Sequence, residues 1–429
     1  MKIFVTGDNG PCLPTPYGGI MKRCLLHAKH WRLLGAEVCL HVHNHHDDES
    51  DLGAGAQYVF DFNQKPTIQD KIFFLLKNFV ANPMLFIEAL TLATKLNPTF
   101  DAAYLFYIAG RACKIQEVIS DFKPDIIVTE TGGLQSLVAV LVANKNNIPV
   151  VIENYAEIQY KAKADGVNIA PLFAPMWKYI FDGVDLVIPA SKHCALGPQK
   201  YISDESKMQV VYSGISFNVF NGRAESDKIR AREKFNLPAD KRLVMAVGSL
   251  QMRKGHDHLF EALTLLPPED RKEIVVVLCG MGNIPELKAR AAEVGFPDEY
   301  LKIYSGLSED DLAELYSAVD CFCFPSISPR ECMGMAMKEA MAIGLPIAAY
   351  DVGGIKEAIE VGVNGVLVSA GDKHALALAV KKLLILSKQD REQIRVANIE
   401  KARQLFDIKD TSKQMLDLLK QVVDNKKTA

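Results

Sequence analysis

Short apolar runs rich in β-branched residues recur along the chain, and a helical stretch follows each of them. Apolar strands that alternate with helices in this way are typical of parallel sheets covered by helices on both faces. We expect one series of strands in each half of the chain. The first covers residues 2–6, 37–42, 125–129, 150–153 and 185–189, and the second 243–247, 274–278, 302–304, 321–324, 346–350 and 365–368.

Two such series in tandem predict an α/β chain of two Rossmann-like, doubly wound domains that face each other across a ligand-binding cleft. A length of 429 residues suits two domains of about 200 residues each. We place the first domain at residues 1–205, the second at 206–405 and a terminal helical segment at 406–429.

Residues 67–121 lack a strand pattern and are rich in Phe, Leu, Ile and Ala. They predict several helices inserted into the first domain. These helices either pack on the sheet or form a surface that docks an acceptor or a membrane.

Composition narrows the classes of function. A net charge of −3 argues against broad binding of nucleic acid, which needs a concentrated basic surface. The N-terminal apolar run ends at Thr6, too short for a secretory signal, and no window approaches the ~20 apolar residues of a membrane helix. We therefore expect a cytoplasmic protein whose scattered cysteines are reduced core residues.

Two loops carry glycines or cations next to a helix start. Gly18 and Gly19 precede the first helix, where free N–H groups attract anions and a ligand can approach the backbone closely. The segment GSLQMRKG, residues 248–255, places Arg253 and Lys254 at the expected edge of the second sheet. Cations at that edge can bind a diphosphate.

Two further loops follow strands of the second series. In PSISPRECMGMAMKEAMAIGLP, residues 325–346, Glu331 lies in the loop and Glu339 in the helix that begins near Gly334. Carboxylates on either side of a helix N-terminus suit one ligand, because the dipole holds its phosphate while the acids bind its hydroxyls. The segment DVGGIKE, residues 351–357, repeats the arrangement of strand, two glycines and helix start.

Together these motifs resemble the retaining GT-B glycosyltransferases of family GT4, over nearly the whole chain. The resemblance implies that Glu331 lies beside the donor sugar, that Glu339 binds the ribose and that Lys254 binds the diphosphate. It implies transfer with retention of anomeric configuration, with no cofactor and no metal. It also places the amides of Met333, Gly334 and Met335 at the sugar and its phosphate, Gly19 at the phosphate from the other domain, and the final helix, residues 411–423, back on the first domain.

The chain departs from the family at two positions. Ser249 stands where the family often has an arginine, and Tyr155 is nearest to a place that often holds histidine. A diphosphate leaving group needs more than one cation, so we expect Arg330 to replace the missing arginine, with Arg253 as the alternative. We expect a UDP-sugar as donor, with a GDP-sugar as the alternative.

We expect transfer to a glycan, lipid-linked or small-molecule acceptor, in the cytoplasm or in peripheral contact with the inner face of the membrane. Three other functions are alternatives to this one. One is an inactive nucleotide-sugar-binding partner protein on the same fold, and another is a nucleotide-sugar epimerase of the same architecture. The third is a metalloprotein built on HVHNHHDDE, residues 41–49, where His41 and His43 share a strand face. The sequence leaves the acceptor, the sugar and the linkage open.

Overall fold

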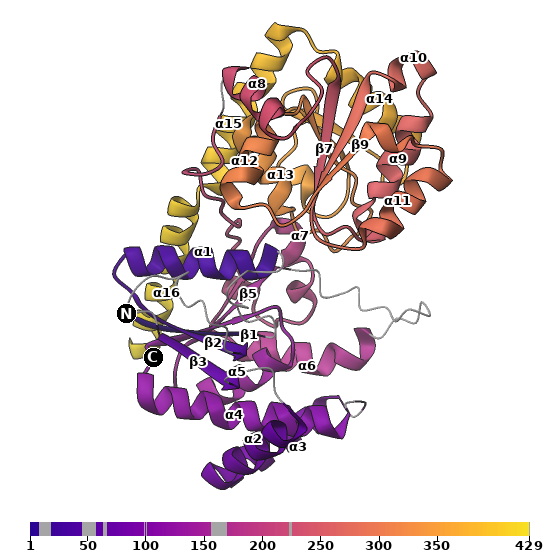
Figure 1. Cartoon of the computed structure of the whole chain (residues 1–429). Helices are drawn as coiled ribbons and strands as arrows, with labels where there is room; N and C mark the ends of the chain where they lie inside the picture. Colours follow the sequence, from indigo (N-terminus) through magenta and orange to yellow (C-terminus); the bar gives the residue numbers. More distant parts are fainter. Residues whose placement is uncertain are drawn as a thin grey trace. The chain divides into compact units, whose positions relative to one another are not determined.

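The structure is a computed structural model that describes residues 1–7, 19–44, 57–62, 67–97, 99, 101–155, 170–222 and 225–428. The chain divides into two compact units (Figure 1). Unit 1 comprises Met1–Ser213 and Ile408–Ala429, and unit 2 comprises Gly214–Asp407. The division thus falls after residue 213 rather than 205, and the chain returns to unit 1 at residue 408 rather than 406.

Unit 1 is built on a six-stranded parallel sheet with the order β3-β2-β1-β4-β5-β6. Five of its strands are those that the apolar runs predict. The sixth, β3, was not predicted, because it pairs only with β2 at the edge and its apolar run, residues 58–60, is short and lies between Gln57 and Asp61. The strands are β1 (Lys2–Gly7), β2 (Glu37–Asn44), β3 (Gln57–Phe62), β4 (Ile126–Glu130), β5 (Val150–Asn154) and β6 (Leu186–Pro189).

Helices cover both faces of this sheet, because successive strand residues point to opposite sides. Ile3 and Val5 of β1 pack against α1 (Gly19–Leu33) and α16 (Ile408–Thr428), whereas Phe4 packs against the helices of the other face. That second layer contains α3 (Pro83–Leu96), α4 (Ala102–Phe122), α5 (Leu134–Lys145) and α6 (Ala170–Gly183). A single turn, α7 (Lys192–Ala195), follows β6.

The segment predicted to hold inserted helices contains α2 (Ile68–Ala81), α3 and most of α4. Helices α3 and α4 contribute to the core, whereas α2 buries only Phe74 and Asn78. Within the described ranges, no single helix has the length and apolarity needed to cross a membrane. The consecutive pair α2 and α3 meets both criteria together, but it bends by 113° at the break between them.

Unit 2 repeats the doubly wound plan with the strand order β12-β11-β10-β7-β8-β9, all parallel. All six strands match predicted runs. They are β7 (Arg242–Val247), β8 (Ile274–Cys279), β9 (Leu301–Tyr304), β10 (Cys321–Phe324), β11 (Ile347–Tyr350) and β12 (Gly365–Val368). The helices are α8 (Glu225–Lys234), α9 (His256–Thr264), α10 (Pro268–Arg271), α11 (Ile284–Glu293), α12 (Glu309–Ser317), α13 (Met335–Ile343), α14 (Lys373–Leu384) and α15 (Lys388–Phe406).

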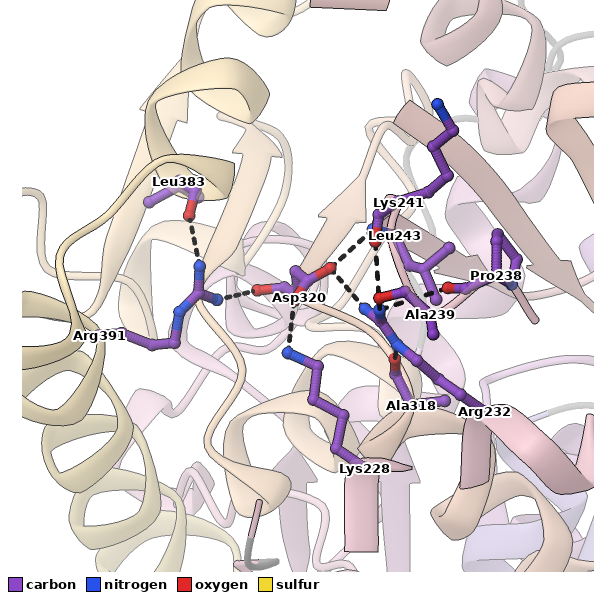
Figure 2. A network of polar contacts seen from close by, with 10 residues as sticks. All are labelled: Lys228, Arg232, Pro238, Ala239, Lys241, Leu243, Ala318, Asp320, Leu383 and Arg391. Carbon is purple, nitrogen blue, oxygen red and sulfur yellow. Dashed lines mark hydrogen bonds and ion pairs between the residues drawn. The ribbon is translucent and has the colours of Figure 1, made fainter. Parts of the chain in front are cut away.

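Asp320, directly before β10, joins several elements of unit 2 (Figure 2). Its carboxylate accepts hydrogen bonds from Lys228 of α8 at 2.5 Å and from the backbone N–H of Leu243 at 2.7 Å. Arg232 donates to it at 2.8 Å, and Arg391 of α15 donates to its backbone carbonyl at 2.6 Å. Burial raises the pKa of Asp320, but these cations and the Leu243 N–H outweigh burial and lower it overall. The network fixes the amino end of β10.

Candidate functional site

The carboxyl ends of β7 and β10 lie side by side in unit 2, with Met245 opposite Phe322. The strand order reverses between these two strands, and such a switch point is where open α/β sheets bind ligands. The loop that follows each strand therefore begins at the same place. The two loops approach each other closely at Gly255, which has a φ of 70°. A Cβ there would lie 1.9 Å from the Pro325 carbonyl oxygen, so only glycine allows this contact.

Lys254 and Glu331 form an ion pair across these loops. Lys254 ends a short 3-10 helix, Met252–Lys254, and Glu331 lies in the loop after β10. Ser326 also donates to Glu331 Oε1, at 3.0 Å. Glu331 is 7% exposed and the Lys254 side chain 19% exposed, so water screens the pair only weakly. Two residues predicted separately thus meet at the switch point.

The second glycine pair positions the backbone of Glu331. Gly354 N–H donates to the Glu331 carbonyl at 3.1 Å. Gly353 has a φ of 57°, and a Cβ on it would lie 1.8 Å from the same carbonyl oxygen. The motif DVGG therefore supports the Glu331 loop by a close approach that only glycine allows.

Helix α13 begins beside this loop at Gly334, which has a φ of 64° and no side-chain cap. A Cβ at Gly334 would lie 2.5 Å from the Phe324 ring. Met333 is buried, and Met335 is the first residue of the helix. The first N–H groups of a helix have no partner within it and carry its positive dipole end, so this terminus can bind an anion.

Glu339 lies in the second turn of α13 and is buried. The hydroxyl of Tyr316 donates to Glu339 Oε2 at 3.1 Å and lies 3.1 Å from the carbonyl of Ala336. Burial, with the nearby Glu339 charge, raises the pKa of Tyr316 well above its usual value, so the phenol stays a donor. Sequence reasoning missed Tyr316, because it comes from α12, a helix that carries no site motif.

Arg253 and Arg330 are exposed residues on the same two loops. Arg253 Nε donates to Gln251 Oε1 at 2.9 Å, and the Arg330 backbone N–H donates to Ser328 Oγ at 3.3 Å. Ser249 follows β7, and its hydroxyl oxygen is buried with no partner among the described atoms. The arginine that the family often has here is thus replaced by an unpaired hydroxyl.

His256, the first residue of α9, is a second polar group that sequence reasoning missed. Its Nε2 lies 3.2 Å from the Ser249 carbonyl, and its buried Nδ1 has no partner among the described atoms. Burial, together with the neighbouring Lys254 charge, lowers the pKa of His256 to about 4, against the opposing effect of the hydrogen bond to the Ser249 carbonyl. The imidazole is therefore neutral at physiological pH. One feature of the sequence could have pointed to His256: it directly follows Lys254 and Gly255 at the start of a helix.

Unit 1 has its own polar cluster at the carboxyl ends of β1, β4 and β5. Arg23 of α1 lies 3.6 Å from Glu153, and its guanidinium stacks on the Tyr155 ring at 3.8 Å. Tyr155 donates to Glu153, and Arg23 to Ser213. Burial raises the pKa of Glu153 to about 8; Arg23 opposes the shift and the nearby Glu130 adds to it. One guanidinium thus faces two buried carboxyl groups, of which Glu153 holds its proton up to about pH 8.

Two predicted residues of unit 1 lie at the limit of the described ranges. Gly18 lies outside them, and Gly19 is the first residue of α1. For the metal hypothesis, His41 is buried, with Nδ1 3.0 Å from Thr6 Oγ1, while His45 and His46 lie outside the described residues. No group of three metal-ligating side chains occurs among the residues that the structure describes.

Comparison with known proteins identifies the family of unit 2. Residues 227–401 match the family of glycosyl transferases group 1. Unit 2 is a group 1 glycosyltransferase domain. The D-inositol 3-phosphate glycosyltransferase of Xylanimonas cellulosilytica is 33% identical over 228 residues, 52% of this chain and 53% of that protein. The sulfoquinovosyl transferase of Arabidopsis thaliana is 27% identical over 297 residues, 65% of this chain and 55% of that protein. The chain thus matches about half the length of these relatives.

Solved structures extend the likeness beyond the group 1 domain. The Anabaena protein HepE in complex with UDP has a TM-score of 0.72 at 20% identity, covering 98% of this chain and all of that one. Sucrose-phosphate synthase from Thermosynechococcus elongatus has a TM-score of 0.75 at 18% identity, covering 99% of each chain. The two doubly wound units therefore have the GT-B fold, as the sequence predicts.

Proposed function

We propose that this protein transfers a sugar from a nucleotide diphosphate donor to an acceptor hydroxyl, with retention of anomeric configuration. The observation that carries the proposal is the pairing of Lys254 with Glu331 beside the uncapped N-terminus of α13, inside a group 1 glycosyltransferase domain. A UDP-sugar is the favoured donor, because structural relatives are complexes with UDP and with UDP-glucose. Glycan, lipid-linked and small-molecule acceptors all fit, in the cytoplasm or in peripheral contact with a membrane.

Bond breaking in this reaction places negative charge on the diphosphate. The acceptor oxygen attacks the anomeric carbon, the bond from that carbon to the phosphate oxygen breaks, and the departing phosphate takes the acceptor proton. Lys254 would leave Glu331 for the diphosphate, and the first amides of α13 would bind it as well. Glu331 would then accept hydrogen bonds from the sugar hydroxyls.

Nucleotide binding would use the rest of the same segment. Glu339, held by Tyr316, would bind the ribose hydroxyls. Arg330 would supply the charge absent at Ser249, with Arg253 as the alternative cation. Gly18 and Gly19 would admit the phosphate to the start of α1. Two cations and a helix terminus could stabilise the leaving group with no metal ion.

A donor screen tests the proposal most directly. The protein is incubated with UDP-, GDP- and ADP-sugars and a panel of acceptors, and release of the nucleotide diphosphate is measured with and without EDTA. Release from one donor class that depends on acceptor and survives EDTA is expected, and proton NMR of the fresh product should show the donor's anomeric configuration. An inactive binding protein would release nothing, and an epimerase would change the sugar while it stays bound to the nucleotide.

A further inference from the structure

Helix α2 exposes an unusual amount of apolar surface for a folded unit. Six of its large apolar side chains are 41–77% exposed: Ile68, Ile72, Phe73, Leu76, Phe79 and Val80. At 100° per residue these side chains fall within one arc of about 140° on the helix. A contiguous exposed patch of this kind marks an interaction surface rather than the scattered apolar residues of an ordinary surface.

The opposite side of α2 fixes the helix to unit 1. Phe74 and Asn78 are its two buried residues. Phe74 lies against Gly110 of α4, where an added Cβ would be 2.7 Å from the ring, and its ring contacts that of Tyr107 at a tilt of 43°, with centroids 5.7 Å apart. Thr67 and Asp70 form a capping box at the helix start. The apolar arc is therefore held facing outward by a rigid support.

Lysines stand at both edges of the arc. Lys71 and Lys77 are exposed, and neither forms an ion pair with a described residue. By helical geometry, Lys71 lies beyond Leu75 on one edge of the arc and Lys77 beyond Phe73 on the other. The single acid of α2, Asp70, is bound by the backbone N–H and hydroxyl of Thr67. The arc thus includes one polar residue, Gln69, and has Lys71 beyond one edge and Lys77, beside Asp70, beyond the other, so that the lysines exceed the acid by one charge.

We infer that α2 lies in the surface of a lipid bilayer with anionic headgroups, its apolar arc among the acyl chains and its two lysines at the headgroups. A wide apolar face edged by Lys is the pattern of interfacial helices, and the long lysine stems let the charges reach the headgroups. The 113° bend before α3 and the packing of one side of α3 in the core of unit 1 favour lying on the membrane over crossing it.

This inference gives a surface to the peripheral membrane contact in the proposed function, but its test needs neither donor nor acceptor. The full-length protein is sedimented with vesicles of phosphatidylcholine alone or with about one third phosphatidylglycerol. We expect binding to the anionic vesicles. Lys71→Gln with Lys77→Gln should weaken it at least about tenfold, and Ile72→Ser with Leu76→Ser should abolish it.

Matched controls separate the face from general effects on charge and hydrophobicity. Lys29→Gln changes an exposed lysine on α1, and Leu378→Ser an exposed leucine on α14; neither should alter vesicle binding. The α2 variants should keep the wild-type melting temperature and donor turnover, because their side chains are exposed. As an independent probe, Leu76→Trp should shift its fluorescence to shorter wavelength on anionic vesicles only.

Three outcomes would overturn the inference. The first is no binding of the wild-type protein to either vesicle, with no shift from Leu76→Trp. The second is equal binding by the wild-type protein and the Ile72→Ser, Leu76→Ser variant. The third is a dimer in solution, measured by sedimentation equilibrium without lipid, that the same variant dissociates; this would assign the face to a second copy of the chain. If the wild-type protein bound anionic vesicles but transferred no sugar, that result would count against the proposed function alone.

Discussion

The environment of the Glu331 side chain is unusual for a loop residue. It lies in a loop, yet it is buried and receives hydrogen bonds from Ser326 and Lys254. A buried carboxylate that holds a lysine keeps both groups in place until a ligand with its own negative charge competes for the cation. The ion pair thus preorganises the loop for a phosphate-bearing ligand.

Glu331→Gln should reduce transfer by several orders of magnitude, because a neutral amide neither pairs with Lys254 nor accepts as strongly from sugar hydroxyls. Lys254 keeps part of its hydration, so we expect a loss of only about 1–3 kcal/mol in the free energy of unfolding. Steady-state kinetics and urea unfolding check the two parts. Glu360→Gln, at an exposed acid, is the control; turnover near that of wild type in Glu331→Gln would remove Glu331 from the reaction.

The cation that replaces the absent arginine is tested by a pair of substitutions. Arg330→Ala should cut transfer at least about tenfold if Arg330 binds the leaving diphosphate. Adding Ser249→Arg should restore part of the loss, since it returns a cation to the end of β7. Kinetics of the single and double variants decide this, with Arg253→Ala measured alongside. A silent Arg330→Ala combined with a defective Arg253→Ala would move the role to Arg253.

The buried carboxylate of unit 1 should make stability depend on pH. The pKa of Glu153 is raised to about 8 in the folded chain. The unfolded chain therefore loses this proton first, near pH 4.5. Stability from this group is full below that pH and falls as the pH rises toward about 8. Arg23, Glu130, Tyr155 and Cys24 are the charged and titratable groups around Glu153 among the described residues.

Glu153→Gln stays neutral at every pH and should abolish this decline. Urea unfolding of the wild-type protein and the variant at intervals between about pH 5 and pH 8 measures it. The free-energy difference between the two should shift steadily in favour of the variant as the pH rises. A constant difference over that range would mean that Glu153 titrates at its ordinary pKa.

The contacts among the candidate site residues depend on packing that their motifs do not contain. Glu331, Lys254 and Glu339 could be named from their motifs. Their partners Ser326 and Tyr316 could not, because hydrogen bonds from other elements depend on packing that one chain pattern does not contain. Likewise the contact of Lys254 with Glu331 requires β7 and β10 to be neighbours in the sheet. The 73 residues between Val247, the end of β7, and Cys321, the start of β10, hide this pairing in the sequence.

At the scale of elements, the loop after β11 acts as a support for the loop after β10. Gly353 and Gly354 touch the backbone of Glu331, although the sequence suggests only another glycine turn before a helix. Strand runs were predictable because burial on both faces leaves a continuous apolar pattern. The edge strand β3 was not, because it has only one neighbouring strand and polar residues interrupt its apolar run.

Gly353→Ala should displace Glu331 and impair transfer far more than it destabilises the unit. A Cβ there would overlap the Glu331 carbonyl, and the positive φ adds strain. Gly362→Ala is the matched control: its φ of 86° is also positive, but nothing lies within 4 Å of the added Cβ. We expect Gly362→Ala to lose about 1 kcal/mol of unfolding free energy from backbone strain. Gly353→Ala should lose more, because the Glu331 backbone must move, and transfer should be lost in Gly353→Ala alone. Equal activity in the two variants would refute the supporting role.

At the scale of the whole molecule, the chain's last helix belongs to its first unit. Met415, Leu416, Leu419 and Val423 of α16 are buried in the core that α1 shares with the sheet. Ser412 adds polar contacts, with its hydroxyl 2.9 Å from His27 Nδ1 and its carbonyl accepting from Trp31 Nε1 at 3.1 Å. Unit 1 therefore includes α16, which follows unit 2 along the chain.

Removal of residues 408–429 should unfold unit 1 and leave unit 2 folded. Burial of four apolar side chains contributes about 1.5–3 kcal/mol each, which together is comparable with the whole stability of a typical domain, about 5–15 kcal/mol. Calorimetry should show one transition lost and the other unchanged, and a synthetic peptide of residues 408–429 should restore the lost one. Deleting only residues 427–429, where Lys427 and Thr428 are exposed, is the control. Two intact transitions in the longer deletion would show that α16 is dispensable to the fold of unit 1.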